Sequence, residues 1–562
     1  MVDNFTYYAQ HMHVHSCYEP PGASMEGHIF NAQKLGMRYI WFTDHDIRMG
    51  RLRSELDRFD FSNGLTYDHE GANVGFLPKE NQRGRICICN ESSSVDGKSM
   101  KMSVEGESEE WQGCAATLVS YAKSHTASLL SDIILFFKYK TELFDSKNSR
   151  LIFDVKLSER PPKHTAAHIF YVVGSTEGLN APHTLVIPIE EVRGFRDAEF
   201  RLSRDAVTEE AVIRGIGGLD NCFDNVTVRL EARYGVKAVA YIDEFSKTRG
   251  HTAQKTYELQ KEVAREIGAR YGVTPFVATE ISYAGMHKNC FSTHLRILPY
   301  EARGYEISND EACNSMLEQG KVFSINHPFT RFKRKDLSLF NLDEEVMKIA
   351  DTYTENACYG ASLLEVGFPD GRYLPLEYHL KLWDILSSRG FFLTGYGASD
   401  SHSNKSGWYG GNNFVLWLGI ADCEDEKTED AFIDAMRAGR GYTGDPIFID
   451  GGVSFLGEDG QTFGSVTSVY KEESKKVFFS CKVMRRGWIL RWIVNGDVNR
   501  ETCFEDGDFS DSCHIKAEKA VNFVRAELYN DTGRCILITN PIYFVRRDIK
   551  EINIPKERQF VK

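Results

Sequence analysis

Residues 7–16, YYAQHMHVHS, begin with a strand-like run and continue with three histidines at alternate positions. Because side chains alternate from face to face along a strand, these histidines would project from the same face. A helix-like segment follows at 24–37, with apolar residues three and four positions apart, and then the apolar run RYIWF at 38–42. Strand, helix and strand in succession predict the start of an α/β architecture.

The composition is that of a soluble globular protein. The chain has 562 residues, of which 42% are hydrophobic and 26% charged, so two to four domains are expected. No apolar run reaches membrane-spanning length, and residues 1–10, MVDNFTYYAQ, lack the basic and apolar regions of a signal peptide. The 13 cysteines are scattered without paired spacing, which favours reduced thiols. We therefore expect a cytoplasmic protein that does not contact membranes.

The charge balance narrows the choice of partners. A net charge of -13 argues against nonspecific binding to nucleic acid, whose phosphates require a basic surface. A small anionic molecule could still bind in a locally positive pocket. The expected partner is therefore a small-molecule substrate, and the oligomeric state stays open.

The local pattern divides the chain into four segments. Residues 1–70 and 251–445 alternate strand-like and helix-like stretches, and the second of these segments opens with a helix that ends at Gly272. Between them, residues 71–250 contain alternating apolar and polar runs separated by Gly, Pro, Asn and Asp, which predicts an inserted β-sandwich. Residues 446–562 have the same pattern and predict a C-terminal β domain.

Histidine and carboxylate side chains follow five strand-like runs of the alternating segments. The carboxyl ends of the parallel strands of a barrel meet at one face, so residues far apart in sequence can form one cluster there. Five such motifs predict a single site rather than scattered core histidines. They are HVHS at 13–16, TDHD at 43–46, TEIS at 279–282, INHP at 325–328 and SDSH at 399–402.

In this order the motifs resemble those of the polymerase and histidinol phosphatase (PHP) superfamily. Its members have an HxH motif, a TDH motif, a Glu, two separate His and a closing DxH. The resemblance covers roughly residues 9–70 and 250–445, and the stretch 525–544 is similar to the C-terminal β module of a branch that includes a carbaryl hydrolase. The corresponding residues are His13, His15, Asp44, His45, Glu280, His294, His327, Asp400 and His402.

This resemblance implies a distorted (β/α)7 PHP barrel, interrupted by the inserted β-sandwich and followed by a C-terminal β-sandwich domain. It also implies a site for two or three divalent metal ions. In the implied arrangement, His13, His15, Glu280 and Asp400 bind the first ion, Glu280, His294 and His327 bind the second, and His45 and His402 bind the third.

Parts of this ligand set leave alternatives open. The family has a further Asp or His after the HxH motif, whereas HVHSCYEPPG offers Glu19, which could bind the third ion or lie in a solvated loop. His294 and His327 could instead be hydrogen-bonded histidines at strand ends. Imidazole and carboxylate ligands suit zinc, manganese or iron and do not choose among these metals.

Four other residues are candidates for supporting roles. Asp44 is expected to orient a metal ligand rather than to bind metal itself. Arg331, in RFKRKD, and Arg48, just after TDHD, could bind substrate oxyanions, although such charge runs are usually solvated. Glu365, in SLLEVGF, could face the site or make a buried structural hydrogen bond.

This set of residue types predicts a hydrolase. Divalent cations lower the pKa of water that they bind and so provide a hydroxide nucleophile near neutral pH. We expect a phosphoesterase acting on a small phosphorylated molecule. That molecule could contain a sugar, because the inserted sandwich weakly resembles a carbohydrate-binding jelly roll. The alternatives are a carbamate, ester or amide hydrolase with the same metal centre, and a noncatalytic ligand-binding protein.

Overall fold

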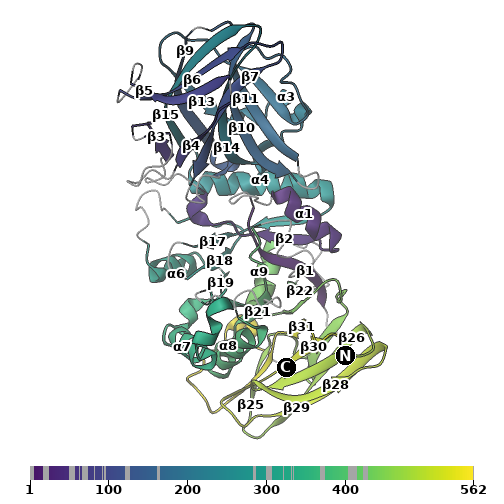
Figure 1. Cartoon of the computed structure of the whole chain (residues 1–562). Coiled ribbons are helices and arrows are strands. Elements are labelled where there is room, and N and C mark those ends of the chain that lie inside the picture. Colours follow the sequence, from purple (N-terminus) through teal and green to yellow (C-terminus); the bar gives the residue numbers. More distant parts are fainter. Residues whose placement is uncertain are drawn as a thin grey trace.

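A computed structural model gives an elongated molecule with β-sheets at both ends and the mixed α/β part between them (Figure 1). Overall, 44% of the residues lie in strands and 22% in helices. The structure describes residues 5–16, 24–49, 57–62, 64–65, 74–81, 83–90, 93, 97–120, 127–142, 144–160, 165–282, 286–298, 307–320, 322–330, 332, 334–367, 374–402, 414–421 and 428–560.

The middle part contains one end of an 11-stranded sheet. In this sheet β1 is flanked by β2, which runs parallel to it, and by β22, which runs antiparallel. All four residues of β2 are buried, as expected for the apolar run RYIWF. The strands of this end, in spatial order, are β16 (Thr274–Val277), β2 (Tyr39–Phe42), β1 (Phe5–Val14), β22 (Val415–Ala421) and β23 (Gly441–Gly444).

A second, five-stranded sheet lies beside it. Its first three strands pair antiparallel and its last three pair parallel. In spatial order they are β17 (Thr279–Ile281), β18 (Lys288–Phe291), β19 (Val322–Ile325), β20 (Leu363–Gly367) and β21 (Thr394–Gly397).

The predicted distorted (β/α)7 barrel is wrong. The described strands of this region belong to two sheets of mixed direction and not to a closed ring of parallel strands, and most of the chain's regular structure is β. The prediction failed because it treated each apolar run as a parallel strand followed by a helix. In the structure, β17 and β18 form an antiparallel pair, and β22 returns antiparallel beside β1.

Helices pack around these sheets, and α1, α4, α6 and α9 begin at side-chain caps. Ser24 accepts a hydrogen bond from the Gly27 N–H at the start of α1, and Thr252 accepts one from Lys255 at the start of α4. The helix α4 ends where expected, at Gly272, whose φ of +65° suits glycine. The helices are α1 (Met25–Lys34), α4 (Ala253–Tyr271), α6 (Asn309–Glu318), α7 (Leu342–Glu355), α8 (Leu376–Ser388) and α9 (Glu429–Ala438).

The predicted inserted β-sandwich is present above α4 (Figure 1). Alternate side chains of its two sheets, among them Leu151, Phe153 and Phe245, form one apolar core. One sheet contains β4 (Val74–Lys79), β7 (Gln112–Ser120), β8 (Ala127–Ser128), β10 (Ser149–Arg160), β11 (Thr165–Gly174), β12 (Thr184–Pro188) and β14 (Cys222–Ala232). The other contains β3 (Asp57–Phe59), β5 (Gly84–Cys89), β6 (Ser99–Gly106), β9 (Ile133–Glu142), β13 (Arg196–Arg201) and β15 (Val236–Arg249).

The sandwich is attached to the middle part at several points. The strands β3 and β15, through which the chain enters and leaves it, pair with each other. A short helical turn, η4 (Gly218–Asp220), also brings the buried Asp220 carboxylate to the start of α1, where it accepts hydrogen bonds from the Met25 N–H at 2.7 Å and the Glu26 N–H at 3.0 Å. The sandwich therefore caps a helix of the middle part.

The C-terminal strands continue the 11-stranded sheet, because β31 pairs with β23. A three-stranded sheet covers them, and the two layers share a core with Phe455, Phe479 and Trp492. The continuing strands are β25 (Val466–Val469), β27 (Ile489–Val494), β28 (Asp497–Cys503), β30 (Val521–Tyr529), β31 (Cys535–Thr539) and β32 (Ile542–Arg546). The covering strands are β24 (Val453–Gly457), β26 (Ser474–Met484) and β29 (Gly507–Lys516).

Among the described residues, no helix is both long enough and apolar enough to cross a membrane.

Candidate metal centre

The carboxylate of Glu280 lies at the centre of a buried cluster of histidines. Glu280 itself is fully buried on β17. Its two oxygens lie within 3.5 Å of ring nitrogens of five histidines, which come from segments up to about 300 residues apart in the chain. These histidines are His13, His15, His45, His287 and His327.

The first group in this cluster has two imidazoles and two carboxylates. The Nε2 atoms of His13 and His15 lie 3.0 Å apart, and the Oδ1 atom of Asp400 lies 3.6 Å from the first and 3.2 Å from the second. Glu280 oxygens lie 3.5 Å from each of the two nitrogens. Ligands about 2.1 Å from one tetrahedral metal ion are about 3.4 Å from each other. These spacings therefore fit four ligands of one ion.

A second group surrounds the other side of the same carboxylate. The Nδ1 atom of His45 lies 2.8 Å from Glu280 Oε2, and His287 Nδ1 and His327 Nε2 each lie 3.1 Å from Oε1. Among the described residues, the ligand atoms of His45, Glu280 and His287 lie within 4.8 Å of one another. Glu280 can thus serve two cations and screen their repulsion.

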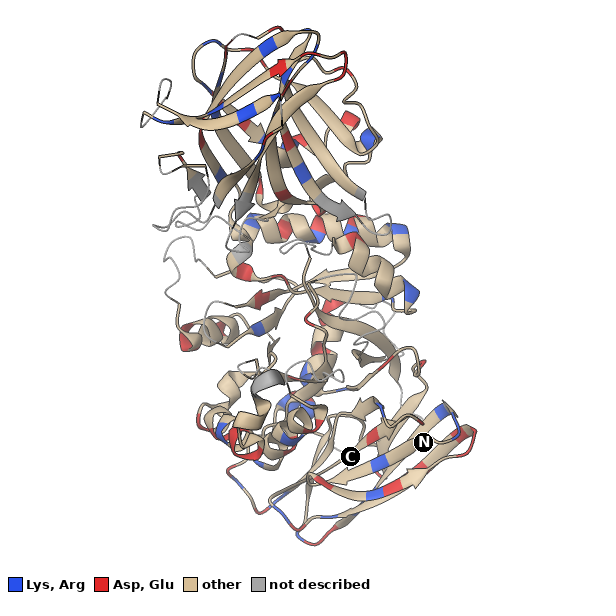
Figure 2. Cartoon of the chain, in the orientation of Figure 1, with Lys and Arg blue, Asp and Glu red and all other residues tan. Residues whose placement is uncertain are grey.

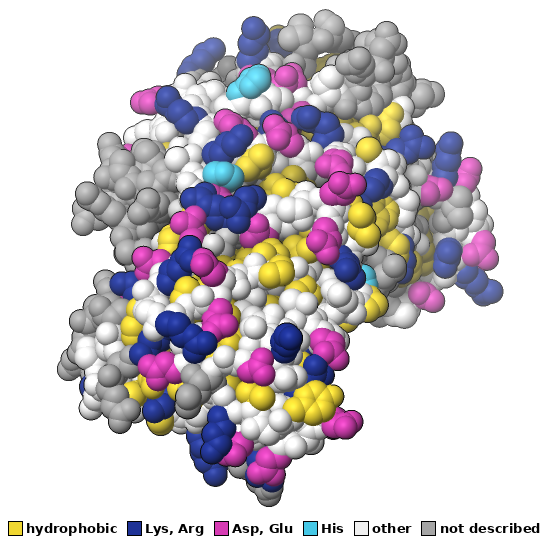
Figure 3. All heavy atoms as spheres, turned by 90° about the horizontal axis from the view of Figure 1, so that it is seen from above, with side chains coloured by type: hydrophobic (Ala, Val, Ile, Leu, Met, Phe, Trp, Pro, Cys, Tyr) yellow, Lys and Arg dark blue, Asp and Glu magenta, His cyan; other side chains and the backbone are white. Residues whose placement is uncertain are grey.

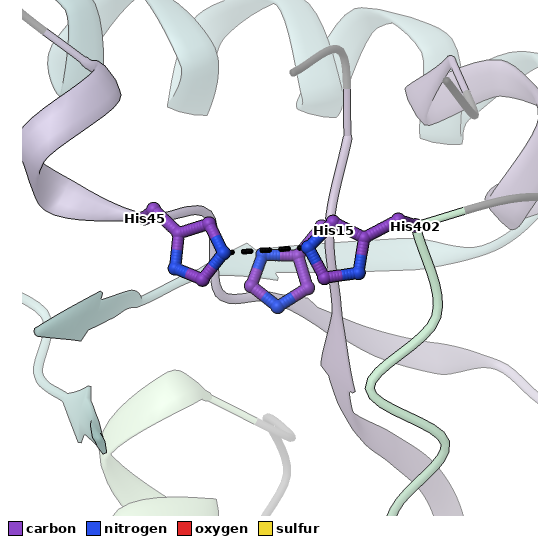
Figure 4. Close-up of side chains that lie close together, drawn as sticks. All are labelled: His15, His45 and His402. Carbon is purple, nitrogen blue, oxygen red and sulfur yellow. Dashed lines mark hydrogen bonds between the residues drawn. The ribbon is translucent and has the colours of Figure 1, made fainter. Parts of the chain in front are cut away.

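A third group consists of three histidine rings (Figure 4). The rings of His15 and His402 stack with centroids 4.0 Å apart, and His402 Nε2 lies 3.3 Å from His45 Nε2. His15 and His45 also belong to the first and second groups, so the three groups form one continuous centre. The imidazole and carboxylate groups present therefore fit the binding of divalent ions.

The backbone brings the ligand-bearing segments together directly. His15 N–H donates to the Ser401 carbonyl at 2.9 Å, and Glu280 N–H donates to the Asp44 carbonyl at 3.0 Å. Two members of the cluster, His327 and Asp400, have φ of +25° and +49°. Non-glycine residues rarely adopt this conformation, and it is concentrated at functional sites.

The electrostatics of the cluster keep both carboxylates charged. Burial alone would raise the pKa of Glu280, but His13 and His45 outweigh it and hold this pKa well below its usual range. The pKa of Asp400 is likewise held well below its usual range, because the effects of His15 and His13 outweigh the effect of burial. Burial, followed by repulsion from His402 and His45, lowers the pKa of His15 and keeps it neutral. Charged carboxylates beside a neutral imidazole are the ligand forms that divalent cations require.

His294 is a correction to the predicted ligand set. It is exposed, lies beyond the end of β18, and is outside the cluster. His287, just before β18, occupies the position that was expected for His294, because the antiparallel pairing of β17 and β18 places His287 beside Glu280. The other predicted ligands within the described residues are in the cluster, namely His13, His15, His45, Glu280, His327, Asp400 and His402.

The remaining candidates have different outcomes. Glu19 and Arg331 lie outside the described residues, as does the side chain of Arg48, whose backbone ends the short helix η1 (Asp46–Arg48). Asp44 is fully buried and does not join the cluster. Its carboxylate accepts hydrogen bonds from Ser16 N–H at 2.5 Å and Ser16 Oγ at 2.6 Å, so it holds the residue next to His15 in place.

Two residues near the cluster were missed or left open by the sequence. His287 has a recognisable signal: Glu280 pairs with Asn289, and side chains two residues apart on a strand share a face, so His287 faces Glu280. Glu365 does face the site, because its Oε1 lies 2.5 Å from His13 Nδ1. Both inferences need the strand register, which the motifs alone do not give.

The cluster is closed on most sides. The side chains of His13 and Glu280 have no exposed area, whereas those of His402 and His287 are 24% and 33% exposed. A substrate would therefore reach the cluster on the side of His402 and His287. Over the molecule as a whole, acidic and basic residues are interspersed (Figure 2), and the face seen from above mixes both with apolar side chains (Figure 3).

Comparisons with known proteins do not assign a family. A scan of protein families found no match, and a search of curated protein sequences found none. Among solved structures, a glycoside hydrolase domain of Endo-D from Streptococcus pneumoniae is matched over 32% of this chain and 22% of its own, with 11% identity and a TM-score of 0.19. The chain thus spans about a fifth of that protein.

Two further matches cover almost the whole of a smaller protein. A family 30 carbohydrate-binding module from Clostridium thermocellum is matched over 35% of this chain and 99% of its own, with 10% identity and a TM-score of 0.21. A family 12 xyloglucanase from Bacillus licheniformis gives the same coverage and identity with a TM-score of 0.24. At these scores the matches do not bear on function.

Proposed function

We propose that this protein is a metal-dependent hydrolase whose centre is the Glu280 cluster. The observation that supports the proposal is the burial of one carboxylate among five histidine rings, with a second carboxylate, Asp400, alongside. Burying an isolated charge is costly. A buried cluster of carboxylates and imidazoles is therefore expected where a protein uses it to bind cations or protons. The motif order that resembles the PHP superfamily supports the same proposal.

Divalent ions bound in this cluster would supply Lewis acidity and a water of lowered pKa. The protein's own residues divide the remaining work. Glu280 lies between the first and second groups and holds them at a fixed separation. Asp44 holds Ser16, the neighbour of His15, so the position of this ligand is set before a substrate arrives. His402 and His287, the most exposed members, are placed to meet the substrate first.

Within this class we propose that the substrate is a small phosphate ester. The resemblance to the PHP superfamily supports this choice, and so does the basic stretch RFKRKD, which begins four residues after His327 in the sequence. Phosphoryl oxygens gain charge during transfer and are stabilised by cations and arginines. The alternative is hydrolysis of a carbamate, ester or amide at the same centre. The test must distinguish this activity from phosphate-ester hydrolysis.

The test combines metal analysis with an activity panel. Protein purified without chelator is analysed for zinc, manganese and iron and is then assayed on phosphomonoesters, phosphodiesters, carbamates, esters and amides. We expect two or three metal ions per chain and turnover of a phosphate ester. Removing the ions with a chelator should abolish turnover, and adding back the metal found should restore it.

A matched pair of variants separates the centre from general effects. His15→Ala should lower turnover by more than the roughly 10- to 100-fold typical of residues that only support ligands, because His15 belongs to two groups. His294→Ala, an exposed control on the same segment as His287, should retain both metal and turnover. Turnover of carbamates or amides alone would exclude the phosphoesterase, and absence of metal in chelator-free protein would leave a ligand-binding protein without catalysis.

A further inference from the structure

A row of buried polar side chains crosses the five-stranded sheet beneath the metal centre. Each strand contributes a residue at or near the same level, and each of these residues is at most 1% exposed. Polar groups are costly in such a position unless they are hydrogen-bonded, so a continuous row indicates a specific network. Its members are Glu280 on β17, Asn289 on β18, Ser324 on β19, Glu365 on β20 and Tyr396 on β21.

Glu365 is the member of this row that reaches two ligands of the centre. Its Oε1 lies 2.5 Å from Nδ1 of His13, and its Oε2 accepts the backbone N–H of His327 at 2.5 Å. Tyr396 Oη lies 3.2 Å from Oε1 and supports the carboxylate from below. The two ligands belong to different groups of the cluster, so one side chain links both.

The geometry at His13 fixes the direction of its ring. A charged carboxylate is only an acceptor, so the hydrogen between Glu365 and His13 belongs to Nδ1. The other nitrogen, Nε2, faces His15 Nε2 and Glu280 and is therefore the one that a metal ion at this place would bind. A metal-binding histidine that donates its second N–H to a carboxylate is held in one tautomer and one orientation.

The contact with His327 serves the same end through the backbone. His327 has a φ of +25°, a conformation that a non-glycine residue keeps only when its surroundings hold it there. The hydrogen bond from its N–H to Glu365 is one such restraint. Its ring nitrogen Nε2 in turn lies 3.1 Å from Glu280.

We propose that Glu365 is the positioning residue of this centre: it makes His13 bind metal through Nε2 and holds the strained backbone of His327. The inference rests on the proposed metal centre and concerns how that centre is oriented. Glu365 itself does not touch the substrate or the metal.

The sharpest variant is Glu365→Gln, because it keeps the shape and changes one acceptor into a donor. A carboxylate accepts at both oxygens, whereas an amide accepts at one and donates at the other. If the amide NH2 faces His13, it forces the ring into the other tautomer. If the amide NH2 faces His327, two donors oppose each other there. We expect metal affinity, measured by competition with a chelating dye, to fall by about 10- to 100-fold. The visible spectrum of the cobalt-substituted protein should also change, since it reports ligand geometry.

Two controls accompany this variant. Glu365→Asp keeps both acceptors and should recover part of the affinity that Gln loses. Tyr396→Phe removes one supporting hydrogen bond without changing an acceptor of His13 or His327, and it should lower affinity by less than about 10-fold. Circular dichroism and thermal unfolding are recorded for each variant.

A measurement on the unaltered protein covers the case in which Glu365→Gln does not fold. In zinc-loaded protein with ¹⁵N-labelled histidine, the His13 ring should show a protonated Nδ1 and a metal-bound Nε2. Metal bound at Nδ1 would overturn the inference, as would Glu365→Gln protein with unaltered affinity and cobalt spectrum. Failure of the wild-type protein to bind any metal would instead count against the proposed function.

Discussion

Glu280 shows how much of this site depends on single residues. One carboxylate is within reach of five histidines, and two of these are His13, on β1, and His15, just past the end of that strand. Alternate positions on a strand share a face, which is why an HxH motif can deliver two ligands to one ion. His11 has the same parity but a different role, because its Nδ1 accepts the His13 backbone N–H at 3.3 Å.

The first prediction concerns the finding that His287, and not His294, lies beside Glu280. His287→Ala removes a ring nitrogen 3.1 Å from Glu280 and should weaken metal binding by at least about 10-fold, whereas His294→Ala should leave it unchanged. Titration with zinc or manganese against a competing chelator measures both. Equal losses in the two variants, or a loss only with His294→Ala, would contradict the placement of His287.

At this scale the sequence picks out residues that lie together in the structure where the motif is local. His13, His15, His45, Asp400 and His402 lie in short patterns whose spacing already places them together. His287 and His294 follow Glu280 by 7 and 14 residues, and the choice between them depends on where the chain turns back. That turn is decided by pairing between β17 and β18, which no pattern of residue types specifies.

At the scale of single elements, buried charges join helices to sheets. Arg525 on β30 forms a paired contact with Asp384 on α8, at 2.8 and 2.7 Å, and a third contact with Glu527 at 2.5 Å. These residues border a cavity of about 1050 Å³ between α8 and the C-terminal strands. The side chains of Arg525 and Glu527 are 2% and 3% exposed, so the ion pairs fix the helix against the sheet.

The second prediction concerns this ion-pair group. Arg525→Ala would leave Asp384 and Glu527 buried without their partner, and we expect the free energy of unfolding to fall by about 3–5 kcal/mol. Lys516→Ala, which breaks an exposed pair with Glu472, should change the free energy of unfolding little. Urea unfolding followed by circular dichroism measures both. A loss with Arg525→Ala no larger than that with Lys516→Ala would refute a structural role.

Glu429, in the first turn of α9, gives a prediction for pH. Burial raises its pKa to about 7, against the opposing effect of Lys261, whose Nζ lies 3.9 Å away. A carboxyl with a raised pKa binds its proton more tightly in the folded state, so the folded state loses stability as the pH rises from about 4.5 toward 7.

Replacing this carboxyl with an amide removes the charge that is costly above neutral pH. We expect Glu429→Gln to raise the free energy of unfolding by about 1–2 kcal/mol at pH 8 and to change it little at pH 5. Asp434→Asn, an exposed control on the same helix, should have no more than a small effect at either pH. Urea unfolding at the two pH values measures these changes. An increase in the free energy of unfolding that is the same at pH 5 and pH 8 would exclude titration of Glu429 as its cause.

At the scale of the whole molecule, the sandwich is connected to the metal centre through α1. Asp220 caps the first turn of this helix, and His28 in its second turn has Nε2 3.0 Å from the backbone carbonyl of His15. Burial lowers the pKa of His28 to about 4, so the ring stays neutral. A displacement of the sandwich would therefore be transmitted to the backbone of a metal ligand.

The fourth prediction tests this connection. Asp220→Ala removes the acceptor of two helix N–H groups and should cost about 1–2 kcal/mol of stability, as the loss of an N-terminal cap does. It should also weaken metal binding several-fold, because α1 supports His15. Glu210→Gln, an exposed acidic control in the sandwich, should change neither quantity. Chelator competition and thermal unfolding on the full chain measure the two effects, and unaltered metal affinity in Asp220→Ala would rule out the connection.

At this scale the sequence predicted the parts better than their assembly. The alternating runs between residues 71 and 250 predicted the sandwich, because alternation depends only on neighbouring residues. The expected barrel failed because strand direction depends on pairing partners far along the chain, as in the antiparallel return of β22 beside β1. The C-terminal strands were expected to form a separate domain, and the pairing of β31 with β23 joins them to the site-bearing sheet.

The pairing of β3 with β15 has a consequence for the history of such a chain. Phe59 on the entering strand lies opposite Phe245 on the leaving strand, so the two connections of the sandwich are already side by side. A tight turn could join them, and the whole insertion could be gained or lost without reordering the strands around the metal centre. A relative without it would need another acceptor for the Met25 and Glu26 N–H groups, which Asp220 binds here in addition to the Ser24 cap.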